Sequence, residues 1–436
     1  MNAVFMSIVA IAFGIAAVRQ VMWSGAAADA PMAALGKAMI DAAGGSVTLA
    51  IGLVGVMALF LGLMKVAEQG GLLTIIAKTL RPLLVRLFPD VPAEHPAMGA
   101  MILNMAANVL GLGNAATPFG IRAMQQLQSL NKEKAVATDS MALFLAINTS
   151  SITLLPTGVI AIRAAAGSQD PAGIVPTTLF ATICSTTVAI FMAKFLAKRW
   201  PAPKMVPQAE TPDEASDGNL AETPDEPAGD WKVAAGEAYP VWVSVTALLF
   251  VAALVPLTIF HGRAVAPWII PGLMVGLLAF GWFKKVPVYE AFVEGAKDGF
   301  NVALRIIPYL VAILVAVGMF RASGAMDLVI QPLGAITGLV GLPADALPMA
   351  LLRPLSGSGA YGIMASIIQD PSVGPDSYVG YLVSTFQGST ETTFYVLAVY
   401  FGAVGIRRIR HALAAALCAD VAGIVAAVFI VSVLYG

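Results

Sequence analysis

Charged residues are scarce in this 436-residue chain. Asp, Glu, Lys and Arg make up 12% of it, whereas soluble domains contain about 25%. The 25 basic and 26 acidic side chains nearly cancel, so the chain has no excess of positive charge with which to bind phosphates. These deficits exclude an ordinary soluble enzyme, a disordered chain and a nucleic-acid-binding protein.

Cysteine and histidine are also rare. The two cysteines, Cys184 and Cys418, lie inside apolar runs, and the three histidines do not cluster, which argues against a disulfide framework or a metal site. The sequence has no Gly-x-Ser-x-Gly, His-Glu-x-x-His or Walker motif, whose residues would supply a nucleophile, a zinc site or an ATP site. We therefore expect neither an enzyme nor a bound cofactor or metal.

Long apolar runs are abundant. Hydrophobic residues make up 58% of the chain, and its mean hydropathy is +0.83. A helix needs about 20 predominantly apolar residues to cross a bilayer, so we predict an all-α, polytopic membrane protein. Its expected spans are the runs 4–18, 47–64, 175–195, 241–260, 265–283, 306–320 and 412–434.

Four further apolar runs, 98–112, 141–162, 349–368 and 378–401, are interrupted by polar residues or glycines. Non-helical backbone inside a membrane is tolerated only where it is buried in protein or lines a cavity. We therefore expect broken or re-entrant helices at these places.

The segment 201–239 is rich in Pro, Asp and Glu, and it contains Ala-Glu-Thr-Pro-Asp-Glu twice, at 209–214 and 221–226. This composition is typical of an extended, disordered linker. It divides the chain into a first half, 1–200, and a second half, 240–436.

The two halves show similar features in the same order, as in a duplicated transporter core. Basic residues follow the last apolar run of the first half, at 194–199, but precede that of the second half, at 407–410. The positive-inside rule therefore predicts two repeats of inverted topology. The matching landmarks are Gly71 and Gly324, Pro82 and Pro332, Pro92 and Pro343, and Pro96 and Pro348.

The first apolar run has no Lys or Arg before it, and Arg19 follows it. A cleaved signal peptide has the opposite order of charge. We therefore expect an uncleaved first membrane helix, although Ala28-Asp29-Ala30 resembles a cleavage site. The expected location is the cytoplasmic (inner) membrane of a prokaryote, with several spans.

The first polar break, at 104–118, contains amides and glycines. Its first two asparagines are four residues apart and so share one helical face. The polar residues before Pro118 are placed to cap a helix that restarts there. This pattern suits either a solute site or packing between helices. The candidate ligands are Asn104, Asn108, Asn114 and Thr117, and the helix-breaking glycines are Gly111 and Gly113.

The other breaks carry hydroxyl and amide side chains at matching places in the two halves. Such groups are costly inside an apolar stretch unless they face a cavity or a partner. The candidate ligands are Asn148, Thr149, Ser150 and Ser151 in the first half, and Ser356, Ser358, Gln387, Ser389, Thr390, Glu391 and Thr392 in the second. Gly357, Gly359 and Gly388 are the predicted helix breakers there.

Glu391 stands out among these residues. A carboxylate inside an apolar run is a functional hypothesis by default, because it can take a proton, bind a solute or pair with Arg353. A buried Glu391–Arg353 pair with a purely structural role is the alternative. We expect less of Arg163, which snorkels to the membrane surface, and of Asp420, which pairs with a cation.

Two of these motifs resemble known families. The stretch 104–124 together with 148–151 resembles the spore maturation protein A family. The stretch 387–402, which begins Gln-Gly-Ser-Thr-Glu-Thr-Thr-Phe-Tyr, and its continuation to 411 resemble spore maturation protein B. The chain is thus similar to a fusion of the two, joined at the acidic linker.

Both families belong to the nucleoside-recognition, or Gate, group. That group is similar to the membrane core of concentrative nucleoside transporters and to the membrane part of a ferrous-iron transporter. The resemblance implies two Gate-type repeats with broken helices. In the nucleoside transporters, a Gln-Thr-Glu element on a re-entrant hairpin contacts the base. The matching positions here are Gln387, Thr390 and Glu391, with Gly388 and Ser389 between them.

We expect a secondary transporter, driven by a proton or sodium gradient, that binds a nucleoside, an organic acid or an amino-acid-like solute at the midplane. One alternative is a non-transporting recognition or regulatory protein that acts with a partner. Another is an intramembrane enzyme. The expected partners are the lipid bilayer and a small solute, and a homodimer is left open.

Overall fold

The structure, a computed structural model, describes residues 2–26, 30–111, 113–200 and 238–436. The acidic repeats of the linker lie outside the described residues, and so do the side chains of Asn114 and Ser358. Within the described part the chain is helical, with one isolated bridge between Val136 and Arg408. The predicted all-α fold is confirmed.

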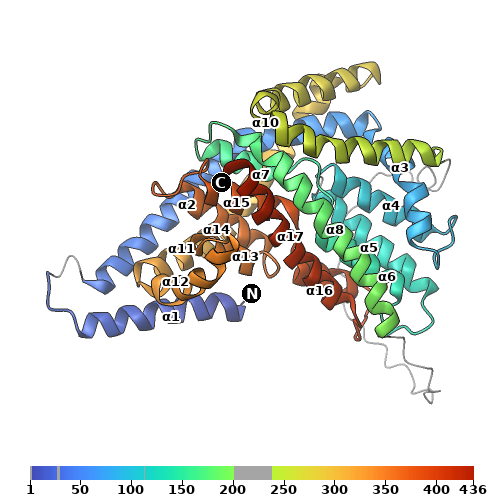
Figure 1. Ribbon diagram of the computed structural model, residues 1–436. Coiled ribbons are helices and arrows are strands. Elements are labelled where there is room, and N and C mark those ends of the chain that lie inside the picture. Colours follow the sequence, from blue (N-terminus) through green and yellow to red (C-terminus); the bar gives the residue numbers. More distant parts are fainter. Residues whose placement is uncertain (1, 27–29, 112, 201–237) are drawn as a thin grey trace, which may run out of the picture.

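The first half is a series of helices that ends in α8, and two of them, α6 and α7, are short and separated by a break at 151–156 (Figure 1). They are α1 (Asn2–Val21), α2 (Pro31–Gln69), α3 (Leu72–Leu87), α4 (Pro96–Val109), α5 (Gly113–Leu130), α6 (Asp139–Ser150), α7 (Thr157–Ala165), η2 (Pro171–Gly173) and α8 (Ile174–Arg199).

The second half follows a similar order and ends in α17. Its elements are α10 (Val241–Phe283), α11 (Val288–Ala322), α12 (Ala325–Thr337), η3 (Gly338–Val340), η4 (Ala344–Ala346), α13 (Leu347–Leu352), α14 (Gly357–Gln369), α15 (Tyr378–Ser389), α16 (Thr393–Gly402) and α17 (Ala412–Tyr435).

Two local features show that α2–α8 and α11–α17 are built alike. Gly71 and Gly324 precede α3 and α12 with φ values of 82° and 77°, a conformation that suits glycine. Thr138 and Ser377 cap α6 and α15, each accepting a backbone N–H three residues on, which satisfies a donor that the helix start leaves free. We refer to α2–α8 and α11–α17 as the first and second repeats.

Equivalent helices of the two repeats run antiparallel. Ser185 of α8 donates to the carbonyl of Ala419 in α17 at 2.9 Å, and Tyr435 donates to the carbonyl of Gly173 at 2.8 Å. The start of α8 thus meets the end of α17, and the two helices lie side by side through the centre (Figure 1).

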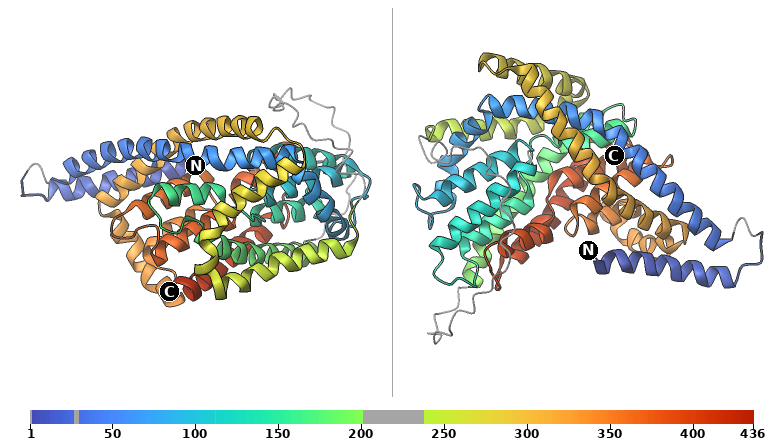
Figure 2. Two further views of the ribbon diagram at one scale, coloured as in Figure 1. Left: turned by 90° about the horizontal axis from the view of Figure 1, so that it is seen from above. Right: turned by 180° about the vertical axis from the view of Figure 1, so that it is seen from behind.

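The other long pair, α2 and α11, has the same geometry, and the two helices stay side by side when seen from behind (Figure 2). Gly62 lies against Phe292, and Gly318 lies against Ala42, so the order of contacts reverses along the partner. A two-fold axis perpendicular to the helices makes the matching helices of two repeats run antiparallel. The predicted inverted topology is therefore confirmed.

The repeats exchange parts of their cores. Helix α16 of the second repeat packs on α5 and α6 of the first, and α7 of the first packs on α14 and α15 of the second. Two hydrophobic clusters result, one around α4–α6 with α16 and one around α13–α15 with α7. The short helices α7 and α16 are therefore buried partly by the other repeat.

The membrane spans differ in detail from the prediction. Three described segments are long and apolar enough to cross a bilayer, namely α2, 171–199 and α17; a pair bent by 101°, 332–340 with 344–352, is a fourth candidate. Helix α10 covers both runs predicted at 241–260 and 265–283. With 39 residues and a rise of about 1.5 Å per residue, α2 extends beyond a hydrocarbon core of about 30 Å.

Candidate functional site at the helix breaks

Each repeat has two helix breaks that bond to each other. In the first repeat, the N–H of Leu154 donates to the carbonyl of Val109 at 3.1 Å. In the second, the N–H of Phe394 donates to the carbonyl of Pro354, also at 3.1 Å. These bonds satisfy backbone groups that the interrupted helices leave free, which a membrane interior demands.

The breaks of the two repeats meet at the centre of the molecule. The N–H of Glu391, between α15 and α16, donates to the carbonyl of Thr149 near the end of α6 at 2.8 Å. The structure therefore brings the predicted polar motifs of both halves together.

An amide network fills the first-repeat side. Asn108 Nδ2 donates to Asn148 Oδ1 at 2.9 Å, and Asn104 Nδ2 donates to the Tyr400 hydroxyl at 3.2 Å. Tyr400 in turn donates to Asn148 Oδ1 at 3.4 Å. In this state the amides bond to each other, as the packing alternative requires. Tyr400 was not predicted as a site residue, because an aromatic residue in an apolar run is ordinary.

The hydroxyls of the first repeat are also engaged. Ser150 pairs with Thr186 at 2.9 Å, and Ser151 pairs with Thr153 at 2.7 Å. Thr149 donates to the carbonyl of Ala146 at 2.9 Å. All three predicted residues are buried, so this end of α6 is closed by its own contacts.

Arg353, at the end of α13, holds the second-repeat break together. Its guanidinium donates to Thr392 Oγ1 at 2.9 Å and to the carbonyl of Gln387 at 3.4 Å, and it also contacts the carbonyl of Thr390. A planar guanidinium with several donors suits this task. It replaces helical hydrogen bonds that α15 loses where it stops.

Glu391 lies beside this guanidinium, with 3.7 Å between its carboxylate and Arg353. The pair forms as one alternative predicted, but it is not buried: the Glu391 side chain is 48% exposed, against 5% for Arg353. The backbone N–H of Glu391 bonds to α6, while its side chain stays half exposed.

Glycine is required where two breaks touch. Gly111 has a φ of 73°, and a Cβ there would lie 2.7 Å from the carbonyl oxygen of Leu155. At Gly357 a Cβ would lie 2.7 Å from Thr392 Oγ1. Ser356 caps α14 next to it, accepting the N–H of Gly359 at 3.0 Å.

One prediction about the first break is wrong. Helix α5 begins at Gly113, and Pro118 lies inside it, so Asn114 and Thr117 do not cap a helix that starts at Pro118. A proline near a helix start removes only one hydrogen bond. The break is set instead by the positive φ of Gly111, which ends α4.

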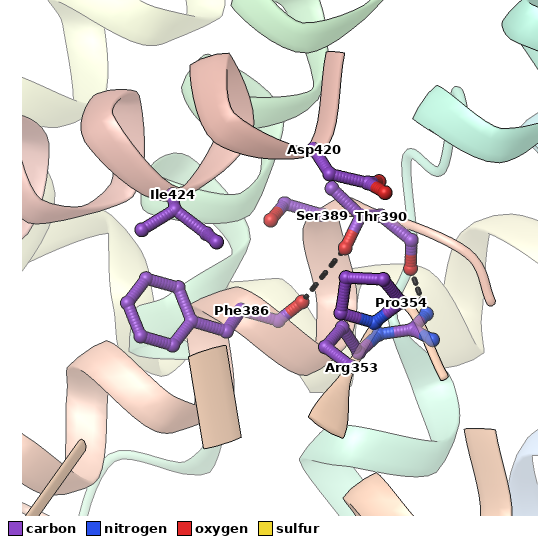
Figure 3. Close-up of a pocket in the computed structure, with 7 residues that line it drawn as sticks. All are labelled: Arg353, Pro354, Phe386, Ser389, Thr390, Asp420 and Ile424. Carbon is purple, nitrogen blue, oxygen red and sulfur yellow. Dashed lines mark hydrogen bonds between the residues drawn. The ribbon is translucent and has the colours of Figure 1, made fainter. Parts of the chain in front are cut away.

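A small pocket lies beside the second-repeat break (Figure 3). It has room for about one water molecule, so this state holds no solute-sized cavity there. Buried polar atoms without a protein partner among the described residues gather around it: Arg353 Nε, Ser389 Oγ and Asp420 Oδ1. The lining residues are Arg353, Pro354, Phe386, Ser389, Thr390, Asp420 and Ile424.

Asp420 matters more than its sequence position indicated. It is buried in the middle of α17, and one carboxyl oxygen accepts a hydrogen bond from Thr393 at 2.6 Å. No cation lies within ion-pair distance of it in the described part of the chain, so the predicted pairing with a cation is wrong here. A lone acidic residue in the last apolar run was the available signal.

The prediction for Arg163 is also wrong. It does not snorkel: it is fully buried, pairs with Asp376 at 3.0 Å and donates to the carbonyl of Pro375 at 2.6 Å. Its guanidinium stacks on Tyr381 at 4.2 Å. An arginine of the first repeat thus holds the start of α15 in the second.

Arg410 makes the equivalent contact in the other direction. It pairs with Asp139 at 2.7 Å and donates to the carbonyl of Ala137 at 3.1 Å. An arginine of the second repeat therefore holds the start of α6 in the first. We call the Arg163–Asp376 and Arg410–Asp139 pairs the two arginine clamps.

Over the described residues, no group of three or more His, Cys, Asp or Glu side chains could hold a metal ion. The chemistry available at the breaks is that of amides, hydroxyls, one guanidinium and two carboxyl groups. These groups can bind a polar solute or a proton.

Comparison with known proteins gives consistent matches. The model of the Gate family, described as nucleoside recognition, matches residues 50–166 and 303–407. Spore maturation protein B of Bacillus subtilis (strain 168) is 50% identical over 167 residues, which are 38% of this chain and 93% of that protein. Spore maturation protein A of the same strain is 47% identical over 163 residues, 37% of this chain and 83% of that protein.

A more distant similarity is to the inner membrane protein YjiG of Escherichia coli (strain K12). It is 31% identical over 81 residues, which are 18% of this chain and 53% of that protein. No solved structure matches the chain.

Proposed function

Since this chain is a membrane protein that belongs to the Gate nucleoside-recognition family, we propose that it is a secondary transporter of a small polar solute. The solute binds between the two repeats, at the helix breaks. The membrane is the bacterial inner membrane, by analogy with the E. coli relative.

The observation that carries the proposal is the meeting of two inverted broken helices. The break after α15 bonds to the end of α6 through Glu391 and Thr149. Inverted repeats with broken helices at their interface are the architecture in which alternating access takes place, because one repeat rocks against the other around a fixed site.

The state described here is closed. The amides and hydroxyls of the first repeat bond to each other, and the pocket beside Arg353 has room for about one water. A solute must therefore replace the Asn108–Asn148 bond, or part the two breaks, in order to bind. Half-exposed Glu391 and its partner Arg353 are the charged groups within its reach.

The groups at the breaks suit nucleosides, small organic acids and amino-acid-like solutes. Amides and a carboxylate match the donors and acceptors of a nucleobase, and a guanidinium matches a carboxylate. Nucleosides are the first class to test, because Gln387, Thr390 and Glu391 stand together beside Arg353. We propose that the solute is moved without chemical conversion.

The test is thermal stabilisation of the detergent-purified protein by a panel of nucleosides, nucleobases, organic acids and amino acids. A ligand of the native state raises the apparent melting temperature. We expect a hit that Glu391→Gln abolishes, and that Asn108→Ala weakens about tenfold or more, because a lost hydrogen bond to a buried group costs about 1–3 kcal/mol. The exposed Asp298→Asn variant on α11 is the matched control.

Uptake of the hit into proteoliposomes then separates transport from recognition. Accumulation driven by an imposed ion gradient supports the transporter. Full uptake by Glu391→Gln would show that Glu391 takes no part in transport. If variants of Asn108 and Asn148 lower stability but leave binding unchanged, these asparagines serve packing and not solute binding.

The closed breaks also fit a second candidate, a recognition or regulatory protein that binds a ligand without moving it. Such a protein needs no open state. Saturable binding with no uptake under any imposed gradient would favour this function over transport.

A further inference from the structure

Arg353 lies near two carboxyl groups. Glu391 pairs with it at 3.7 Å, and Asp420 lines the same small pocket (Figure 3). Glu391 is 48% exposed, whereas Asp420 is 4% exposed. This cluster therefore contains one permanent positive charge and two groups that are negative when ionised.

The charges of this cluster do not balance if both carboxyl groups are ionised. Leaving a charge buried without a partner costs several kcal/mol. Asp420 is the buried carboxyl of the two and has no ion-pair partner in the described part of the chain, so its negative charge calls for one bound proton or one metal cation.

The surroundings favour a proton. The pocket has room for about one water, and a guanidinium, which repels cations, lines it. Hard cations such as Ca²⁺ take about six to eight oxygen ligands. Among the side-chain oxygens that line the pocket in the described part of the chain, only Ser389 Oγ and Asp420 Oδ1 lack a partner.

The proton belongs on Asp420 and not on Glu391. Glu391 already has the guanidinium beside it and has access to the surface. One oxygen of Asp420 accepts from Thr393 at 2.6 Å, and the other lacks a partner. A protonated carboxyl has one O–H donor and further acceptor capacity, which allows it to keep the Thr393 bond and donate into the pocket.

In the described ranges, no charged side chain of the helices packed against α17 forms an ion pair with Asp420. Asp139 of α6 is paired with Arg410, and Tyr400 of α16 is bonded to the asparagine network. On α8, Ser185 donates to the carbonyl of Ala419, the residue before Asp420. The basic residues of α8 lie near the C-terminal end of that helix: Lys194, Lys198 and Arg199. The tyrosines of α15 lie in the first turn of that helix: Tyr378 and Tyr381.

We propose that Asp420 carries one proton in this state and couples transport to a proton gradient by exchanging that proton for Arg353. When the 387–393 segment moves, Arg353 leaves Glu391 and pairs with Asp420. The O–H bond of Asp420 then breaks, and the proton passes to water in the pocket. Coupling, as distinct from proton binding, rests on the transport function proposed above.

Infrared difference spectroscopy of the purified protein, between neutral and alkaline pH, tests the proton directly and needs no solute. We expect the band of one protonated carboxyl in the wild type, shifted by ¹³C-aspartate labelling and not by ¹³C-glutamate. Asp420→Asn abolishes the band. Asp170→Asn and Asp298→Asn, as controls, retain it.

If Asp420 holds its proton because of the charges around it, and not because of burial alone, a second result is expected. Glu391→Gln leaves one cation and one carboxylate, so Asp420 ionises and the band disappears, although residue 420 is intact. A band that persists in Asp420→Asn, or that Glu391→Gln leaves unchanged, overturns the proposal. If Asp420→Asn does not insert into the membrane, Asp420→Glu is used instead. In that variant ¹³C-glutamate, and no longer ¹³C-aspartate, should shift the band.

Proteoliposomes with a trapped pH indicator test coupling. We expect a solute from the panel to move protons in the wild type and not in Asp420→Asn, while binding of that solute survives. Proton-driven uptake that is unchanged in Asp420→Asn would contradict the coupling role of Asp420, but it would still support the transport function. A panel without any bound solute counts against the proposed function, and the infrared result then decides separately whether Asp420 holds a proton.

Discussion

At the residue scale, ionisable side chains behave according to what surrounds them and not according to their place in an apolar run. Glu391 lies in such a run yet is half exposed, whereas Arg163 is fully buried among carbonyls, a carboxylate and an aromatic ring. Asp170 lies in the connection that follows α7. Its backbone carbonyl accepts a hydrogen bond from the guanidinium of Arg163 at 3.2 Å.

The environment of Asp170 predicts a pH dependence. Burial raises the pKa of its carboxyl above the ordinary 3.8, which the charge of Arg163 partly opposes. The folded state therefore binds the proton more tightly than the unfolded chain, so this contribution is present below about pH 3.8 and is lost as the pH rises through the raised pKa. We expect wild type to lose stability relative to Asp170→Asn from acidic towards neutral pH.

Melting temperatures of the two proteins across that range check this expectation. The difference, wild type minus Asp170→Asn, should fall as the pH rises. A difference that grows with pH would mean that the carboxylate of Asp170 is stabilised by folding, contrary to the burial that dominates its surroundings.

At the element scale, the broken helices are held from outside their own repeat. Arg163 of the first repeat holds the start of α15, and Arg410 of the second holds the start of α6. Ser377 and Thr138 cap those same helix starts. The position of each broken helix is therefore set jointly by its own cap and by the other repeat.

Each arginine clamp should contribute measurably to stability. Asp376→Asn and Asp139→Asn remove the carboxylate from a buried guanidinium. We expect each to cost about 1–3 kcal/mol, less than a fully buried pair because both aspartates are partly exposed. Thermal unfolding in detergent should show a fall of a few degrees.

The exposed Asp298→Asn variant is the control for this measurement and should melt like the wild type. A double variant that lacks both aspartates tests whether the clamps are independent, because distant sites add. Single variants that melt like Asp298→Asn would show that the backbone carbonyls suffice to hold the arginines.

At the scale of the whole molecule, the distribution of charge indicates an orientation. The end of α8, the start of α17 and the loop before α6 meet through Arg410, which contacts both Trp200 and Asp139. Lys and Arg are concentrated at this end, in 132–134, 194–199 and 407–410. At the opposite end of α17, the connections 166–173 and 370–377 carry Asp170, Asp370 and Asp376. By the positive-inside rule, we expect the basic end to face the cytoplasm.

Cysteine labelling in whole cells tests this orientation. In a variant without Cys184 and Cys418, a cysteine at Ser372 should react with a membrane-impermeant maleimide added outside the cells. A cysteine at Lys132 should react only after the membrane is made permeable. The reverse pattern would contradict the orientation but not the inverted fold, which rests on antiparallel contacts.

The sequence by itself determined the helical class, the membrane environment, the polar breaks and the inverted repeats. These follow from local properties: apolar length, the cost of free backbone groups in lipid, and the side on which basic residues stand. A cap such as Thr138 or Ser377 is likewise a local signal, because it bonds within one turn of its own helix.

Only the tertiary structure decided which polar groups meet. The bond from Glu391 to Thr149, the network through Tyr400 and the clamp from Arg163 to Asp376 all join residues far apart in the chain. A hydrogen bond requires its two atoms within about 3 Å, and no periodicity of one sequence fixes that distance across two repeats. For the same reason, the isolation of Asp420 became visible only when its neighbours were placed.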